Sequence, residues 1–171
     1  MKTTGITRRV DELGRIVIPK EIRKNMRLKA GELLEIFLND SETITLKKHS
    51  IIDKRQEFLM IYAKTLADQI NADVYITNLN EIIFSNNNDS IGEKLSDDIE
   101  SKIKVLNFNG FEEIKITNNI RLSKPFYIYS LSPNGDISGL LIVKFKNNNS
   151  DKSKPIIKFS TAFLEDYLEN N

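Results

Sequence analysis

Gly14 and Pro19 most restrict how the first part of this 171-residue chain can fold. Glycine accepts the positive φ that a tight chain reversal needs, and Gly14 lies between two short apolar stretches. After it, Ile16 and Ile18 point to one side of an extended segment. Pro19 has no N–H to lose, so it suits the first turn of a helix. The sequence therefore predicts a turn at Gly14, a strand up to Ile18 and a helix that begins at Pro19.

The following residues complete a small domain over 1–50, here called the head. Ile22 and Met26 are one helical turn apart and would face a core. Alternating apolar residues over 34–38 and 43–47, separated by turn-forming residues, predict two more strands. We therefore expect four strands and one short helix in the head. The basic residues of the helix fall on the face opposite the core: Lys20, Arg23, Lys24 and Arg27.

Charge separates this head from the rest of the chain. Residues 1–50 contain eleven lysines and arginines against seven carboxylates, a net charge of +4. Because the whole chain is +1, the remaining residues carry −3. This asymmetry predicts two domains, 1–50 and 51–171, and a polyanion as the partner of the head.

The head is too small to be stably folded as a single copy. With about a dozen apolar side chains, a fifty-residue domain buries too little surface for independent stability. Sharing a core with a second copy would solve this problem. A dimer would also place two basic surfaces on one side, as a two-fold-symmetric reader of duplex DNA requires.

The string from Lys2 to Pro19, KTTGITRRVDELGRIVIP, closely resembles the N-terminal DNA-binding domain of the AbrB-type transition-state regulators, and the resemblance continues through Leu34-Glu35-Ile36 and Leu46-Lys47-Lys48. It implies the swapped-hairpin fold of that family, in which two chains interleave their hairpins into one barrel. It also implies an intertwined dimer that binds double-stranded DNA through arginines.

The positions that match the family's DNA-contacting arginines are Arg8, Arg15 and Arg23. The next basic position of the family falls on Lys24, where lysine keeps the charge but lacks the planar fork of arginine, so a phosphate contact is expected there. We include the neighbouring Arg9 in the predicted DNA-binding set.

The body, residues 51–171, predicts an α+β sandwich with an antiparallel sheet. Apolar residues at helical spacing indicate a helix over 55–70, which we expect to link head and body. A wide apolar arc from residue 153 onward predicts a helix that packs on the sheet and on a partner helix. Strands are expected at 73–77, 81–85, 113–117, 125–131 and 137–146, with a helix start at 96–100.

This order of elements, together with Gly135-Asp136-Ile137-Ser138-Gly139-Leu140-Leu141-Ile142, resembles a GAF domain, a small-molecule-sensing module. An AbrB-type head followed by a GAF-like body implies a regulator of sporulation genes that oligomerises further through its bodies. Whether it is a dimer or a tetramer, an activator or a repressor, and which effector it senses stay open. An antitoxin-like partner protein is the alternative, because swapped-hairpin heads also occur in toxin-neutralising pairs.

Catalysis and metal chemistry find little support in the sequence. The chain has no cysteine and one histidine, His49, and no serine or carboxylate pattern around it suggests a triad. We interpret Asp11 and Glu12 as residues with a turn or helix-pairing role and not as an acid–base pair. No cofactor, metal or enzyme activity is expected, and the lack of a long apolar run favours the cytoplasm. The body could enclose a ligand-sized cavity lined by aromatic residues, but core packing is the preferred interpretation of these residues. They are Phe108, Phe111, Phe126, Tyr127 and Tyr129.

Overall fold

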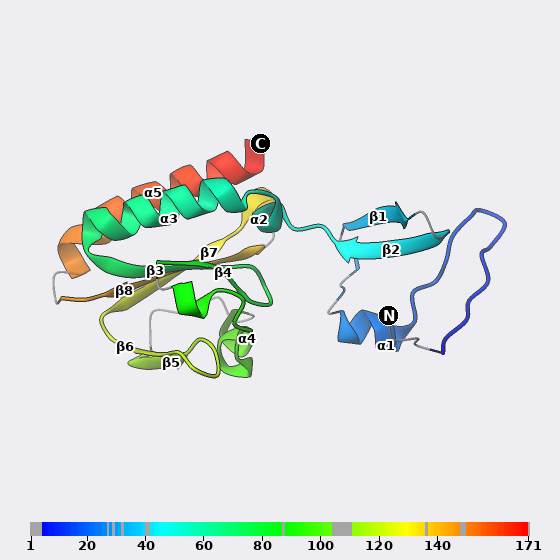
Figure 1. Cartoon of the computed structure of the whole chain (residues 1–171), viewed down its shortest axis with the longest axis horizontal. Coiled ribbons are helices and arrows are strands. Elements are labelled where there is room, and N and C mark those ends of the chain that lie inside the picture. The colour runs from blue at the N-terminus through cyan, green and yellow to red at the C-terminus, as the bar shows by residue number, and fades with distance from the viewer. Residues whose placement is uncertain are drawn as a thin grey trace. The chain divides into compact units, whose positions relative to one another are not determined.

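The computed structural model describes residues 5–26, 28, 30–31, 33–39, 42–86, 88–103, 111–135, 137–147 and 150–170. The chain divides into two compact units, Met1–His49 and Ser50–Asn171, which we call the head and the body (Figure 1). Arg27 on the predicted basic helix face and the predicted core residue Phe108 lie outside the described residues.

The head contains one hairpin and one short helix. Strand β1 (Leu34–Asn39) pairs antiparallel with β2 (Thr43–Lys48), in a register that runs from Leu34 opposite Lys48 to Asn39 opposite Thr43. Helix α1 (Lys20–Asn25) follows Pro19, whose φ of −58° already suits a helix start. Ile22 and Met26, predicted to face a core, are half-buried.

The two other strands predicted in the head do not form within the single chain. Residues 5–10 and 15–18 are described but lie outside any strand. At the turn between them, Asp11 N donates to Arg15 O over 3.0 Å and Gly14 N donates to Asp11 O over 3.0 Å. Gly14 has the positive φ, +75°, that the sequence predicts. Within the described residues, the sheet of the head consists of β1 and β2 alone, so residues 5–10 and 15–18 do not extend it.

The body is built on a four-stranded antiparallel sheet in the order β4-β3-β8-β7. Its strands are β3 (Ala72–Thr77), β4 (Ile82–Ser85), β7 (Phe126–Leu131) and β8 (Gly139–Phe145). A separate small hairpin joins β5 (Glu113–Lys115) to β6 (Arg121–Ser123). The helical segments are α2 (Ile51–Lys54), α3 (Gln56–Ile70), η1 (Asn88–Ser90), α4 (Asp97–Ile103), η2 (Pro133–Gly135) and α5 (Ser150–Asn170).

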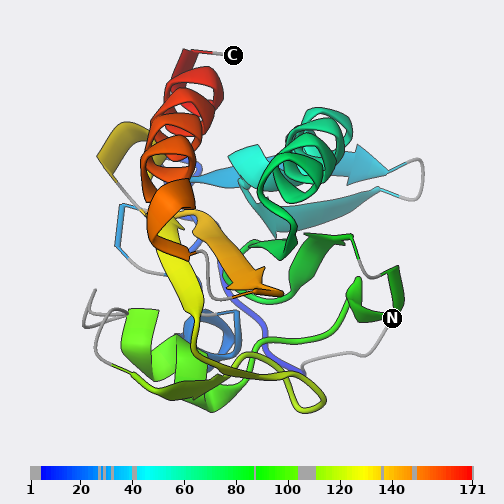
Figure 2. The ribbon, with the colours of Figure 1, turned by 90° about the vertical axis from the view of Figure 1, so that its left-hand side faces the viewer.

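Helices α3 and α5 lie side by side on one face of this sheet, and α4 with the β5–β6 hairpin covers the other (Figures 1 and 2). Alternate residues of each central strand therefore enter different cores. In β3, Val74 and Ile76 pack with α3 and α5, whereas Tyr75 packs with residues of α4 and of the small hairpin. The body thus has two hydrophobic cores, one on each side of the sheet.

These elements make the chain a mixed α+β protein, as predicted: a small N-terminal hairpin domain is followed by a helix–sheet domain. The helix expected over 55–70 runs from Gln56 to Ile70, and its buried residues all belong to the core of the body. A separate four-residue helix, α2, precedes α3, and Arg55 lies between them outside either helix. The sequence did not predict α2 or the three-residue strand β6.

Two local features fix the ends of these elements. Helix α3 ends at Ile70, and its C-cap residue, Asn71, adopts the left-handed conformation with φ +50°. Ser96, predicted as the start of a helix, accepts from the backbone N–H of Ile99 over 3.4 Å at the beginning of α4. Within the described part of the chain, no helix is both long and apolar enough to cross a membrane.

Candidate nucleic-acid interface

The turn between residues 11 and 15 is organised by one carboxylate. Asp11 Oδ1 accepts from the backbone N–H groups of Leu13, at 3.0 Å, and Arg15, at 2.8 Å. The other oxygen, Oδ2, accepts from Nε of Arg15 at 2.8 Å. The backbone hydrogen bond from Arg15, followed by the one from its side chain, lowers the pKa of Asp11 below its ordinary value. Asp11 therefore stays ionised at neutral pH and holds both the turn and the arginine.

This contact orients the guanidinium of Arg15. Because Nε is bonded to Asp11, the terminal nitrogens of Arg15 remain available for a ligand, and the side chain is 71% exposed. A guanidinium whose orientation is fixed in advance loses less freedom when it meets a phosphate or a base edge. A turn role was predicted for Asp11, but this orienting role was not. The four-residue spacing to Arg15 is the signal that could have revealed it.

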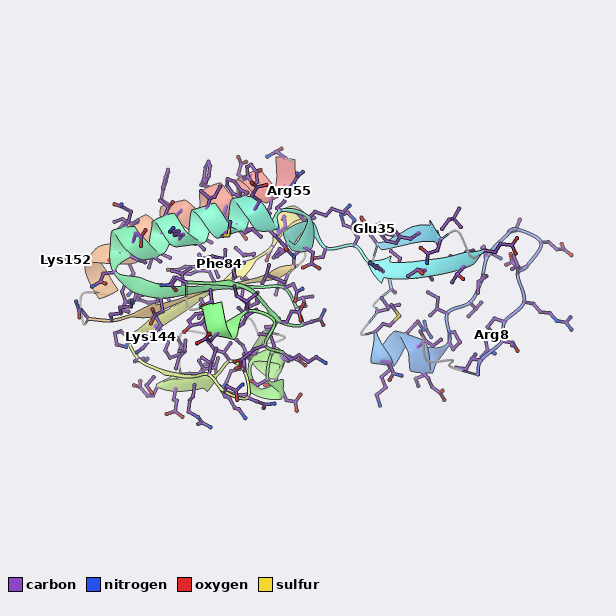
Figure 3. The ribbon with its side chains drawn as sticks, viewed as in Figure 1. Arg8, Glu35, Arg55, Phe84, Lys144 and Lys152 are labelled. Carbon is purple, nitrogen blue, oxygen red and sulfur yellow. The ribbon has the colours of Figure 1, made fainter. Side chains whose placement is uncertain are left out.

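Arg8 and Arg9 lie on the exposed segment before the turn. Arg8 extends from this segment in Figure 3, and one of its terminal nitrogens donates to the backbone oxygen of Thr7 over 2.9 Å. The same segment and the start of α1 enclose a hollow of about 530 Å³. Its wall includes Arg8, Lys20 and Glu21. Arg8 therefore lies close to α1, the helix that carries Arg23 and Lys24.

Arg23 and Lys24 are exposed on α1. Within the described part of the head, neither side chain makes an ion pair, so their charge is not neutralised inside the chain. The five predicted contact residues therefore come from three places: the segment before the turn, the residue that closes it, and one helix. All five are exposed. Such a surface can neutralise phosphates without losing internal ion pairs, apart from the contact that orients Arg15.

His49 has a structural contact at the end of the head. Its Nδ1 lies 2.9 Å from Oε1 of Glu35, which connects the end of β2 to β1. Among the described residues, no group of three or more histidine, aspartate or glutamate side chains could hold a metal ion. His49 is therefore a structural residue of the hairpin. The exposed basic residues are the candidate contacts of the head.

Comparison with known proteins agrees with this arrangement. Residues 7–54 match the family described as antidote-toxin recognition MazE, bacterial antitoxin. Over 49 residues, 29% of this chain and 50% of the relative, the chain is 53% identical to transition state regulatory protein AbrB of Bacillus subtilis (strain 168). The putative transition state regulator Abh of the same organism is 45% identical over 49 residues, 52% of that relative. The head is therefore an AbrB/MazE-type domain.

A further relative spans both units. Stage V sporulation protein T of Bacillus subtilis (strain 168) is 32% identical over 180 aligned positions, which cover 99% of this chain and 99% of the relative. The chain belongs to the family of stage V sporulation protein T.

Proposed function

We propose that this protein is a DNA-binding transcription regulator of sporulation genes. The observation that carries this proposal is the match over almost the full length to stage V sporulation protein T, combined with exposed basic residues in an AbrB-type head. The proposal assigns duplex DNA to the head and places the protein at the nucleoid, in the cytoplasm. It assigns no catalytic step to any residue.

We further propose that two heads intertwine through the swapped-hairpin arrangement. The lack of burial in the head supports this: no described residue from 5 to 49 is buried. A partner strand would pair residues 5–10 and 15–18 and would cover apolar side chains that water now reaches. The large apolar side chains exposed in the head are Val10, Leu13, Ile16, Val17, Leu33, Ile36, Phe37, Leu38, Ile44 and Leu46.

In this dimer, Arg8, Arg9, Arg15, Arg23 and Lys24 of each chain contact DNA. If each chain makes about three or four phosphate contacts, the affinity of the dimer falls with salt with a log–log slope near −5 to −7. With few side chains available to read base edges, much of the sequence preference comes from groove shape and deformability. We therefore expect a loose preference for A·T-rich duplexes.

The body, in this proposal, is a GAF-like domain that joins copies and senses a small molecule. Its four-stranded antiparallel sheet with helices on both faces supports the assignment. Helices α3 and α5 are held together by stacking of Phe58 on Tyr167, with ring centroids 3.7 Å apart. Their outer surface carries five exposed apolar residues, enough for helix packing between bodies and for a tetramer built from two dimers. These residues are Met60, Ile61, Ile156, Phe159 and Phe163.

An antitoxin-like role is the second candidate, because the family that matches residues 7–54 is named for antitoxins. A segment that wraps a toxin is usually short and disordered before binding. Here the head is followed by a folded domain with two hydrophobic cores. That difference favours the regulator.

The test is DNA binding by the full-length protein and its Arg15→Ala variant, measured by fluorescence anisotropy with an A·T-rich duplex over a series of salt concentrations. Removing Arg15 should weaken binding to all sequences by about 1–3 kcal/mol. Because the variant dimer lacks two arginines, its salt slope should be shallower by about 2. Arg121→Ala, an exposed arginine of the body hairpin, is the matched control and should bind as the wild type does.

Sedimentation must show the same assembly for both variants, so that the loss reports a contact and not unfolding. Full-strength binding by Arg15→Ala would contradict the assigned interface. No binding by the wild type, together with capture of a toxin, would favour the antitoxin role.

A further inference from the structure

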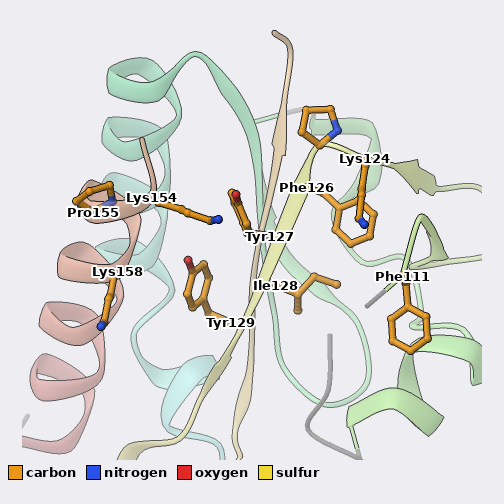
Figure 4. A pocket seen from close by; sticks show the side chains of 10 residues that line it. Phe111, Lys124, Phe126, Tyr127, Ile128, Tyr129, Lys154, Pro155 and Lys158 are labelled. Carbon is orange, nitrogen blue, oxygen red and sulfur yellow. The ribbon is translucent and has the colours of Figure 1, made fainter. Parts of the chain in front are cut away.

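A cavity of about 780 Å³ opens beside β7, the last strand of the body sheet. Figure 4 shows that part of it lies between β7 and α5, where Tyr127 and Tyr129 lie opposite Lys154 and Lys158. The volume of the whole cavity, which also extends to the opposite face of β7 at Phe126 and Ile128, falls in the range of sites that hold small organic ligands. The complete lining is Phe111, Lys124, Pro125, Phe126, Tyr127, Ile128, Tyr129, Lys154, Pro155 and Lys158.

The wall facing α5 combines aromatic and positively charged groups. The rings of Tyr127 and Tyr129 are 6.4 Å apart and tilted by 46°. The edge contact of Tyr127 with Phe145, 5.7 Å between centroids, anchors its ring to the sheet. Nζ of Lys154 lies 5.0 Å from the centroid of Tyr127. Ring faces and an ammonium group are therefore already gathered at one place.

Several polar groups of this wall have no partner in the described part of the chain. Tyr127 and Tyr129 are half-buried, yet neither hydroxyl makes a hydrogen bond with another described residue. Lys158 likewise makes neither a hydrogen bond nor an ion pair with one. Partial burial, followed by the neighbouring Tyr127, raises the pKa of Tyr129, so its hydroxyl keeps its proton at neutral pH and can donate. Half-buried donors without an acceptor favour a ligand that accepts hydrogen bonds.

We propose that the α5 side of this cavity binds a small aromatic carboxylate. The ring of the ligand would lie against Tyr127, Tyr129 and Pro155, and its carboxylate would accept from the lysine ammonium groups and the phenol hydroxyls. A neutral aromatic would leave Lys158, which makes no ion pair with a described residue, without a counter-charge, and a bare anion would leave the rings uncovered. Both parts of the ligand are needed for tight binding.

A strand from a second copy is a less suitable occupant of this edge. Lys154 and Lys158 line the cavity, and Lys124, which also lines it, is ion-paired with Glu112. Two copies joined here would therefore bring the Lys154 and Lys158 ammonium groups of both copies together. Like charges at short range disfavour such a pairing. The positive lining and the half-buried phenols together select an anionic small molecule.

This inference deepens the sensing role proposed above and identifies its site. The test uses the full-length protein labelled with 3-fluorotyrosine, because the chain has only five tyrosines and each gives one fluorine resonance. Tyr→Phe variants assign these resonances. Three probes separate the two halves of the ligand: salicylate carries a ring and a carboxylate, benzamide carries a neutral ring, and inorganic phosphate is an anion without a ring.

We expect salicylate to shift the Tyr127 and Tyr129 resonances saturably, with benzamide and phosphate at least about tenfold weaker. The double variant Lys154→Gln/Lys158→Gln should bind salicylate about tenfold more weakly. Lys152→Gln removes an exposed charge from the same helix outside the cavity lining and is the matched control. It should bind as the wild type does.

The inference is overturned if salicylate gives no saturable shift up to about 10 mM. It is also overturned if benzamide or phosphate binds equally well, or if the double variant binds like the control. The probes do not require DNA, so Arg15→Ala should retain salicylate binding. Loss of DNA binding and loss of the ligand site are therefore separate outcomes.

Discussion

The head and the body obtain their stability in different ways. The body encloses two hydrophobic cores, and large side chains such as Ile76, Leu141 and Ile157 are completely buried there. The head, in contrast, has no buried residue in its described part and exposes Val17 and Leu38 by more than 70%. A domain without fully buried side chains gains little free energy to offset the entropy of ordering its chain. The body has the cores that a single copy needs, whereas the exposed apolar residues of the head agree with the proposal that two heads share one core.

The largest effect is expected in the body core. Leu141→Ala removes a fully buried side chain from the central strand β8 and should lower the free energy of unfolding of the body by about 2–5 kcal/mol. Chemical denaturation of the full-length protein measures this change. Lys146→Ala is the contrast: its ion pair with Asp73, 3.2 Å long, is partly exposed and contributes about 0–1 kcal/mol. Equal losses in the two variants would mean that β8 is not part of a packed core.

The next effect concerns contacts between bodies. Phe159 is 75% exposed on α5, beside the partly exposed Phe163. Phe159→Glu places a charge on the proposed contact and should convert tetramers into dimers, because burying an unpaired carboxylate is costly. Analytical ultracentrifugation measures the assembly. Lys152→Glu, an exposed position on the same helix outside the cavity lining, is the control for added negative charge, and tetramers that persist in Phe159→Glu would exclude this face as the contact.

A smaller effect is expected when the protein is diluted, because the stability of the head should change with concentration and that of the body should not. If two heads share one core, each tenfold dilution lowers the stability of the folded head dimer by about 1.4 kcal/mol, whereas a domain that folds as a monomer does not respond. Hydrogen exchange at β1 and β2 can follow the head, and exchange at β3 and β8 can follow the body in the same sample. Protection of β1 and β2 that does not change with dilution below the dissociation range of the bodies would contradict an intertwined head.

The same contrast explains which elements could be predicted from the sequence. In α5, the sequence predicted two apolar sides, and the structure buries Ile157, Leu164 and Leu168 while Phe159 and Phe163 stay exposed. Helical periodicity identifies such a face because packing within one chain selects it. Strand β6 was missed because it has only three residues, of which only Leu122 is buried. A three-residue strand contains too little alternation to be recognised.

Contacts that depend on side-chain geometry were harder to predict. The five basic residues of the candidate interface could be chosen from the sequence, but the bond from Arg15 to Asp11 follows from the shape of the turn. Tyr127 and Tyr129 were expected to pack in a core, with the lining of a cavity as the alternative. They alternate with buried residues along β7, and each packs partly against the core while it also lines a cavity. Sequence periodicity shows which side of a strand a residue occupies, but not whether a neighbouring element covers it.

The smallest effect is expected from acid. Asp11 in the head and Asp98 in the body both have a pKa below the ordinary 3.8. For Asp11 the main cause is the hydrogen bond from the backbone N–H of Arg15. For Asp98 the main cause is the hydrogen bond from Nζ of Lys102, 2.6 Å long. Because each pKa is lower in the folded state, each carboxylate stabilises the fold at pH values above 3.8 and loses that contribution as pH falls through the lowered pKa. Affinity for DNA should therefore not respond to these two groups between neutral pH and about pH 5.

Carboxyl-carbon NMR titration measures the pKa of both groups in one experiment, and the variants Asp11→Asn and Asp98→Asn assign the two resonances. A titration of Asp11 at or above its ordinary pKa would mean that Arg15 is not held at the turn in solution.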